Sequence, residues 1–125
     1  MQTKAIKTVD VEGPALDWAV TKATGRLDGV KIINGSPPLI LLDGNNWSPS
    51  SDGRQGVVLI ETFSIMIDKN FEDFSTAEEP WFATTDYFWA TGATVLTALC
   101  RAIVKRKLGE TVEVPAVLIS NKREC

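Results

Sequence analysis

Residues 95–107, VLTALCRAIVKRK, decide the fold because their apolar positions recur with the period of an α-helix. The apolar members are spaced by three or four residues: Val95, Leu96, Leu99, Cys100, Ile103 and Val104. The polar and basic residues in or next to this stretch are predicted to face away from the core: Thr94, Thr97, Arg101, Lys105 and Arg106. We expect this helix to begin at Thr91-Gly92-Ala93 and to end at Gly109, with its basic last turn complementing the helix dipole.

A second helix is predicted upstream of the first, starting at Gly13-Pro14, because proline suits the first helical position. Its apolar side chains follow helical spacing: Leu16, Ala19, Val20, Ala23 and Leu27. Gly25 is a plausible terminator for this helix. Residues 3–11 alternate loosely in polarity and predict an edge strand.

The middle of the chain is less regular. Ser36-Pro37-Pro38 predicts an extended break, residues 39–42 form a buried piece of uncertain type, and residues 43–46 form a turn. Residues 47–52 predict a loop that leads into a helix cap at Ser50, Ser51 or Asp52. We interpret residues 57–63 as helix, although their β-branched content also allows a strand.

Two strands are predicted between this helix and the last one. Residues 63–68 alternate, with Phe63, Ile65 and Ile67 on one face, and residues 80–89 form a second strand. We expect these two strands to pair as an antiparallel hairpin around an acidic, aromatic loop at 69–79. The chain is therefore predicted to be an α+β protein, with about three helices around a mainly antiparallel sheet.

Composition limits the class of protein. A chain of 125 residues fits one domain, residues 1–125, and an apolar fraction of 44% is enough for a core. The net charge of −3 argues against nucleic acid as a partner, because binding the phosphate backbone needs a positive field. No segment resembles a signal peptide or a membrane span, so we expect a soluble intracellular protein without a membrane partner. Cys100 in an apolar run and Cys125 at the end do not suggest a disulfide, which fits a reducing cytoplasm.

The sequence lacks the common catalytic motifs. It contains no histidine, which excludes a Ser–His–Asp triad, a Cys–His dyad and a histidine metal site. It also contains no CxxC pair and no Walker loop, and the turn at 43–46 lacks the full calcium-loop pattern. We therefore predict no catalytic residues, no metal and no cofactor, and favour a protein that acts by binding.

Aromatic and arginine side chains are the candidate ligand groups. Five aromatic residues lie between Trp81 and Trp89, and a strand cannot bury all of them on one face. At least one ring is therefore expected to stack on a planar ligand or to contact another subunit, while the others lie in the core. An arginine such as Arg54, next to a predicted helix start, could bind a phosphate, although an ordinary surface arginine is the simpler interpretation of any one of them. The predicted ligand-binding residues are Arg54, Trp47, Ser50, Asp52, Trp81, Phe82 and Arg101.

Three blocks of sequence, in order, resemble NinX-like phage proteins of unknown function. Residues 15–20, ALDWAV, resemble their opening helix, and residues 47–52, WSPSSD, with Gln55-Gly56, resemble their central loop. Residues 91–101 and 107–115 resemble their closing helix and tail, whereas residues 63–89 and Gly53-Arg54 depart from the pattern. The blocks are also similar to the phage α-β-α sandwich domain. That similarity implies helices on both sides of a small, mainly antiparallel sheet, and a phage or prophage product that acts in the host bacterial cytoplasm.

Three functions are consistent with these patterns. The first is a phage accessory protein that counters host defence by sequestering a small cyclic or ADP-ribose-type signalling nucleotide, as a homo-oligomer with sites between subunits. The second is a protein-interaction module that binds and inhibits a host protein through residues 70–89. The third, ranked lowest, is a carboxylate-dependent hydrolase.

Overall fold

The computed structural model describes residues 2–70 and 74–119; residues 71–73 of the predicted acidic loop and Cys125 lie outside this range. Its helices are α1 (Gly13–Ala23), α2 (Gly53–Phe63) and α3 (Val95–Leu108). Its strands are β1 (Thr3–Lys7), β2 (Val30–Ile33), β3 (Leu39–Leu42), β4 (Asn45–Asn46), β5 (Met66–Lys69), β6 (Trp81–Thr85), β7 (Phe88–Gly92) and β8 (Thr111–Pro115). Short 3-10 turns occupy Thr8–Asp10, Leu27–Gly29 and Ala116–Leu118.

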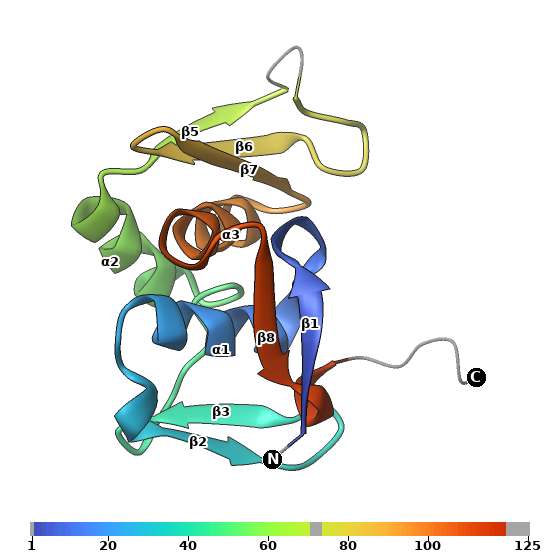
Figure 1. Cartoon of the computed structure of the whole chain (residues 1–125). Helices are drawn as coiled ribbons and strands as arrows, with labels where there is room; N and C mark the ends of the chain where they lie inside the picture. The colour runs from blue at the N-terminus through green and yellow to red at the C-terminus, as the bar shows by residue number, and fades with distance from the viewer. Residues whose placement is uncertain (1, 71–73, 120–125) are drawn as a thin grey trace.

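The strands form three small antiparallel sheets, β1-β8, β2-β3-β4 and β5-β6-β7. Figure 1 shows the β5-β6-β7 sheet over α3, α1 beneath α3, and the β2-β3 hairpin beneath α1. The predicted α+β class, with three helices and mainly antiparallel strands, is confirmed. The strands are divided among three sheets, and α1 and α3 lie between two of them. Within the described ranges, no helix is long and apolar enough to cross a membrane.

Helix α3 is the centre of the core. Every residue from Ala98 to Val104 is buried, because α3 contacts α1, α2, β6, β7 and β8. The prediction that Arg101 faces solvent is therefore wrong, since its exposed fraction is 4%. The predicted helix start is also wrong, because Thr91 and Gly92 belong to β7 and Thr94 is the N-cap. Cys100 is buried, as an apolar-like cysteine should be.

The predicted single strand at 80–89 is two strands. The chain turns at Asp86 and Tyr87, and Asp86 adopts a left-handed φ of 60°. Strand β6 pairs with β5 on one side, as predicted for an antiparallel hairpin, and with β7 on the other. The strand expected from Phe63 begins at Met66, because Phe63 ends α2 and Ser64 takes a left-handed φ of 52°.

The remaining elements follow the sequence closely. Residues 57–63 are helical, and Asp52 is the cap of α2, its carboxylate accepting the Arg54 amide at 3.0 Å. Residues 39–42 form strand β3, and the predicted turn is limited to Asp43-Gly44, since Asn45 and Asn46 are β4. Helix α1 begins at Gly13-Pro14 as predicted, but Leu27 lies beyond it in a 3-10 turn.

Candidate functional site

A groove of about 470 Å³ opens where the N-terminal ends of α1 and α3 meet the loop that precedes α2. Residues 12–17 of the α1 end and residues 37–40 before and within β3 form two of its walls. Residues 46–51 of the loop, with Thr94 and Thr97 of the α3 end, complete it. Four segments that are far apart in the sequence therefore converge at one site.

Asp17 lies in the floor of this groove. Its exposed fraction is 4%, and its Oδ1 accepts a hydrogen bond from the Ser50 amide at 2.8 Å. Burial raises the pKa of Asp17 to about 6, and the hydrogen bonds from Ser50 only partly offset this effect. Trp47 is fixed beside it, because the indole Nε1–H donates to the Asp17 carbonyl oxygen at 3.2 Å. The floor thus holds a carboxyl group and an aromatic ring in defined positions.

The loop that carries Trp47 and Ser50 is held by α2. The Ser48 amide donates to Gln55 Oε1 at 2.7 Å, and Gln55 Nε2 donates to the Asn46 carbonyl at 2.7 Å. Gly56 allows α2 to approach closely, because a Cβ there would collide with the Leu96 side chain and lie 3.2 Å from the Pro49 carbonyl oxygen. These contacts make the loop a rigid wall rather than a lid.

The groove offers hydrogen-bond acceptors and hydroxyl groups. In the part of the chain that the structure describes, the charged residues lining it are Glu12 and Asp17, both acidic. Thr94 caps α3, its hydroxyl oxygen accepting the Thr97 amide at 3.1 Å, so both threonines lie at the positive end of the helix dipole. This arrangement suits a ligand that donates hydrogen bonds and presents a ring to Trp47.

The predicted ligand residues lie in four separate places: the groove, the start of α2, the middle of α3 and strand β6. Trp47 and Ser50 line the groove, as one site. Asp52 and Arg54 follow in the chain, but Asp52 serves as the helix cap and Arg54 is exposed on the first turn of α2, outside the lining.

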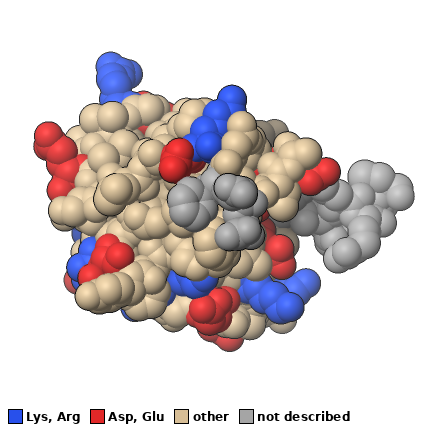
Figure 2. All heavy atoms as spheres, turned by 90° about the horizontal axis from the view of Figure 1, so that it is seen from above, with Lys and Arg blue, Asp and Glu red and all other residues tan. Residues whose placement is uncertain are grey.

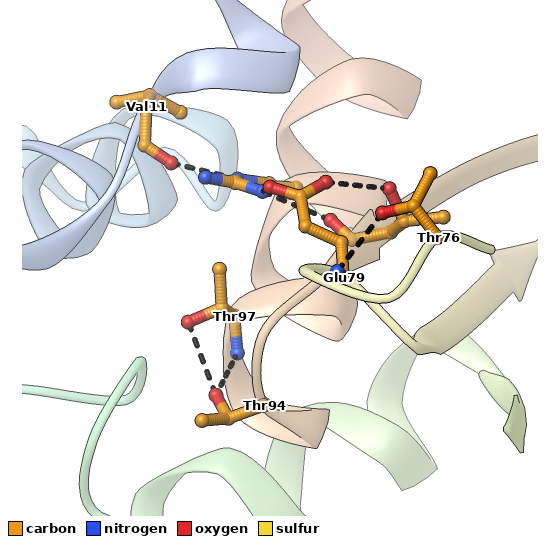
Figure 3. Close-up of polar contacts among 7 residues, drawn as sticks. Val11, Thr76, Glu79, Thr94 and Thr97 are labelled. Carbon is orange, nitrogen blue, oxygen red and sulfur yellow. Dashed lines mark hydrogen bonds and ion pairs between the residues drawn. The ribbon is translucent and has the colours of Figure 1, made fainter. Parts of the chain in front are cut away.

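Arg101 belongs to a polar network in which its own side chain is buried. Figure 3 draws this network and labels two of its members, Val11 and Glu79. The Arg101 Nε–H donates to the Val11 carbonyl oxygen at 2.8 Å, and its Nη1 donates to Glu79 Oε2 at 2.9 Å and to the Thr91 carbonyl at 3.0 Å. The Thr91 hydroxyl donates to the other Glu79 oxygen at 2.8 Å. The guanidinium therefore fixes three parts of the chain, and the prediction that it contacts a ligand is not supported by this placement.

Trp81 and Phe82 lie in β6, across α3 from α1 and away from the groove. The Phe82 ring stacks on the Trp89 ring with centroids 5.6 Å apart. Lys105 Nζ lies over the Trp89 ring, 4.7 Å from its centroid. Lys69 Nζ lies 5.3 Å from the Trp81 ring centroid. Two rings of this segment are exposed, Tyr87 with an exposed fraction of 93% and Phe88 with one of 36%.

The groove residues that the sequence analysis did not name as ligand candidates include Glu12, Asp17 and Thr97. The available signal was Asp17, an acidic residue directly after Leu16 beside the apolar stripe of α1. A charged residue in that position is either paired or placed for function. Its significance was hidden because its partner, Ser50, lies 33 residues away in the sequence.

The surface charges and potential metal ligands of the described residues, and the comparisons with known proteins, do not indicate a second site. On the face that carries β5, β6 and β7, acidic and basic side chains are interspersed among uncharged ones (Figure 2). Among residues 2–70 and 74–119, no group of three or more side chains is arranged to hold a metal ion. No protein-family model matches the chain, and no curated protein matches it.

Proposed function

We propose that the protein is a non-enzymatic binding protein that holds the base and ribose of a small cyclic or ADP-ribose-type nucleotide in the groove. The observation that carries the proposal is the floor of the groove, where the Ser50 amide holds the buried Asp17 carboxyl group and the Trp47 indole donates to the Asp17 backbone carbonyl oxygen. An aromatic face stacks on a base, and a carboxylate accepts hydrogen bonds from ribose hydroxyls. The volume of about 470 Å³ lies within the range typical of small-molecule sites.

The role of such binding is sequestration. The resemblance of residues 15–20, 47–52, 91–101 and 107–115 to NinX-like phage proteins supports a phage accessory protein that acts in the host bacterial cytoplasm. A signalling nucleotide held in the groove is withdrawn from the host receptor that would respond to it, which counters host defence. No chemical step is needed for this effect.

Homo-oligomer formation is part of the proposal. Val57 and Val58 on α2 are each 59% exposed, and Met66 at the start of β5 is 73% exposed. Exposed apolar side chains support a contact between subunits. Sedimentation of the wild type and of Val58→Glu tests this point: a change from oligomer to monomer is expected, and a wild-type monomer contradicts it.

Titration calorimetry tests the proposed function. Cyclic nucleotides and ADP-ribose are titrated into the wild type, Glu12→Gln and Glu61→Gln, the last being an exposed α2 residue outside the groove lining. We expect binding by the wild type and Glu61→Gln, with weaker binding by Glu12→Gln. Absence of heat with every nucleotide contradicts the proposal.

A second function is favoured by one observation. Tyr87, 93% exposed, and Phe88, 36% exposed, lie at the β6–β7 turn within the segment expected to contact a host protein. Exposed aromatic side chains are common anchors of protein interfaces. A pull-down from bacterial lysate should recover a stoichiometric partner that Tyr87→Ala loses, and recovery of none counts against this function.

A further inference from the structure

We infer that the groove recognises the uncharged, hydrogen-bond-donating face of its ligand, the hydroxyl and amino groups of a nucleoside, and leaves phosphate groups outside. This inference rests on the proposed function and adds which part of the nucleotide is read. It differs from the hypothesis, based on the sequence, that an arginine such as Arg54 could bind a phosphate of the ligand.

The charged residues that line the groove in the described part of the chain are acidic. Asp17 lies in the floor and Glu12 on the rim, and no lysine or arginine lines the groove in the described part of the chain. Ionised carboxylates only accept hydrogen bonds, so they attract hydroxyl and amino groups. They repel a phosphate group at close range, where charge interactions are strong.

The arginine side chains near these elements lie outside the groove lining. Arg26 pairs with Asp43 at 2.9 Å on the surface, outside the groove lining. Arg101 is buried, and its contacts to Val11, Thr91 and Glu79 are structural. Arg54 is exposed on α2 beyond the lining, where it could meet only the part of a ligand that projects out of the groove.

Asp17 is already held in position before a ligand binds. The Ser50 amide holds one of its oxygens at 2.8 Å, and the carboxyl group is already removed from bulk water by folding. A donor from the ligand then forms a charge-assisted hydrogen bond without a further large desolvation cost. The N-terminal end of α3 would otherwise suit a phosphate, but the Thr94 hydroxyl oxygen already accepts a hydrogen bond from one of its amides, that of Thr97.

Competition experiments with adenosine, ADP-ribose and pyrophosphate test the inference. We expect adenosine and ADP-ribose to bind the wild type with dissociation constants within about tenfold of each other. Pyrophosphate should not displace either of them. Asp17→Asn should weaken both by about tenfold or more, because it removes the charge that strengthens the hydrogen bonds, while Glu61→Gln should leave both unchanged.

Two different failures can be told apart. If ADP-ribose binds but adenosine does not, or if pyrophosphate displaces ADP-ribose, the ligand is held by its phosphates and the inference is overturned. If neither adenosine nor any nucleotide binds the wild type, the proposed function fails as well. A thermal melt of Asp17→Asn shows that this variant is folded, and equal affinity of the folded variant and the wild type for adenosine also overturns the inference.

Discussion

The burial of the Asp17 carboxyl group is unfavourable for folding but useful for binding a ligand. Its burial makes the ionised form costly, which is why its pKa rises from 3.8 to about 6. A residue that served only to hold the Ser50 amide could do so as an asparagine, whose side-chain oxygen is also an acceptor. A buried carboxyl group at the floor of a groove is therefore better explained by binding than by stability.

The raised pKa of Asp17 predicts a specific pH dependence of stability. A carboxyl group whose pKa is higher in the folded state contributes stability below its unfolded pKa of 3.8 and loses it as pH rises through about 6. Asp17→Asn removes this loss. The free energy of unfolding of Asp17→Asn minus that of the wild type should therefore increase by about 2 to 3 kcal/mol from about pH 4 to about pH 7. Urea denaturation at both pH values measures this, and a difference that does not change with pH would contradict it.

Arg101 is the second residue whose role changed between sequence and structure. Helical periodicity assigns it to the polar face of α3, but periodicity does not tell whether another element covers that face. Here β7, the turn before α1 and Glu79 surround it and satisfy the guanidinium. The position of a buried arginine could not be predicted, because its three partners are 10, 22 and 90 residues away.

Replacing Arg101 by methionine should strongly destabilise the protein. Arg101→Met leaves the carbonyl groups of Val11 and Thr91 without this donor and Glu79 without its ion partner, at a cost of about 3 kcal/mol. Arg26→Met is the matched control, because the Arg26–Asp43 pair is exposed and such pairs contribute about 1 kcal/mol or less. Urea denaturation compares the two variants, and similar losses would refute the assigned role of Arg101.

At the scale of elements, the helices were easier to predict than the strands. The spacing in α1 and α3, with Pro14 at the start of α1 and Gly109 at the end of α3, located the two helices, because these signals are local. The start of α3 was predicted too early, since Thr91 and Gly92 belong to β7. The turn between β6 and β7 was missed because Asp86-Tyr87 contains neither glycine nor proline. An aspartate can adopt the left-handed conformation there, as its φ of 60° shows, but a run of aromatic residues hides it.

The contact between β7 and α3 depends on the absence of a side chain at Gly92. A Cβ at this position would lie 2.6 Å from the Ala98 amide nitrogen of α3, so the backbone itself must move. Gly92→Ala should cost about 1 to 3 kcal/mol, as overpacking does. Gly53→Ala at the start of α2 meets open space and should be neutral or stabilising by up to about 1 kcal/mol. Thermal melting distinguishes the two, and equal melting temperatures would be inconsistent with the close approach.

At the scale of the whole molecule, the site depends on how the layers meet. The α+β class was predictable from composition and periodicity, but the division of the strands among three sheets was not. The groove forms where residues 12–17, 37–40, 46–51 and 94–97 converge, and no local signal links these segments. Two of its residues, Trp47 and Ser50, were named from the sequence because their loop leads into a predicted helix start, whereas Asp17 could be identified only from the fold.

The central claim is that the groove binds the nucleoside part of a nucleotide. Backbone amide and indole NMR spectra recorded during titration with ADP-ribose test it most directly. The account predicts that the largest shifts occur at the Trp47 indole, Ser50 and Thr97, which surround the groove. Shifts that are absent, or that centre on Trp89 of β7 and Lys105 near the C-terminal end of α3, would contradict it.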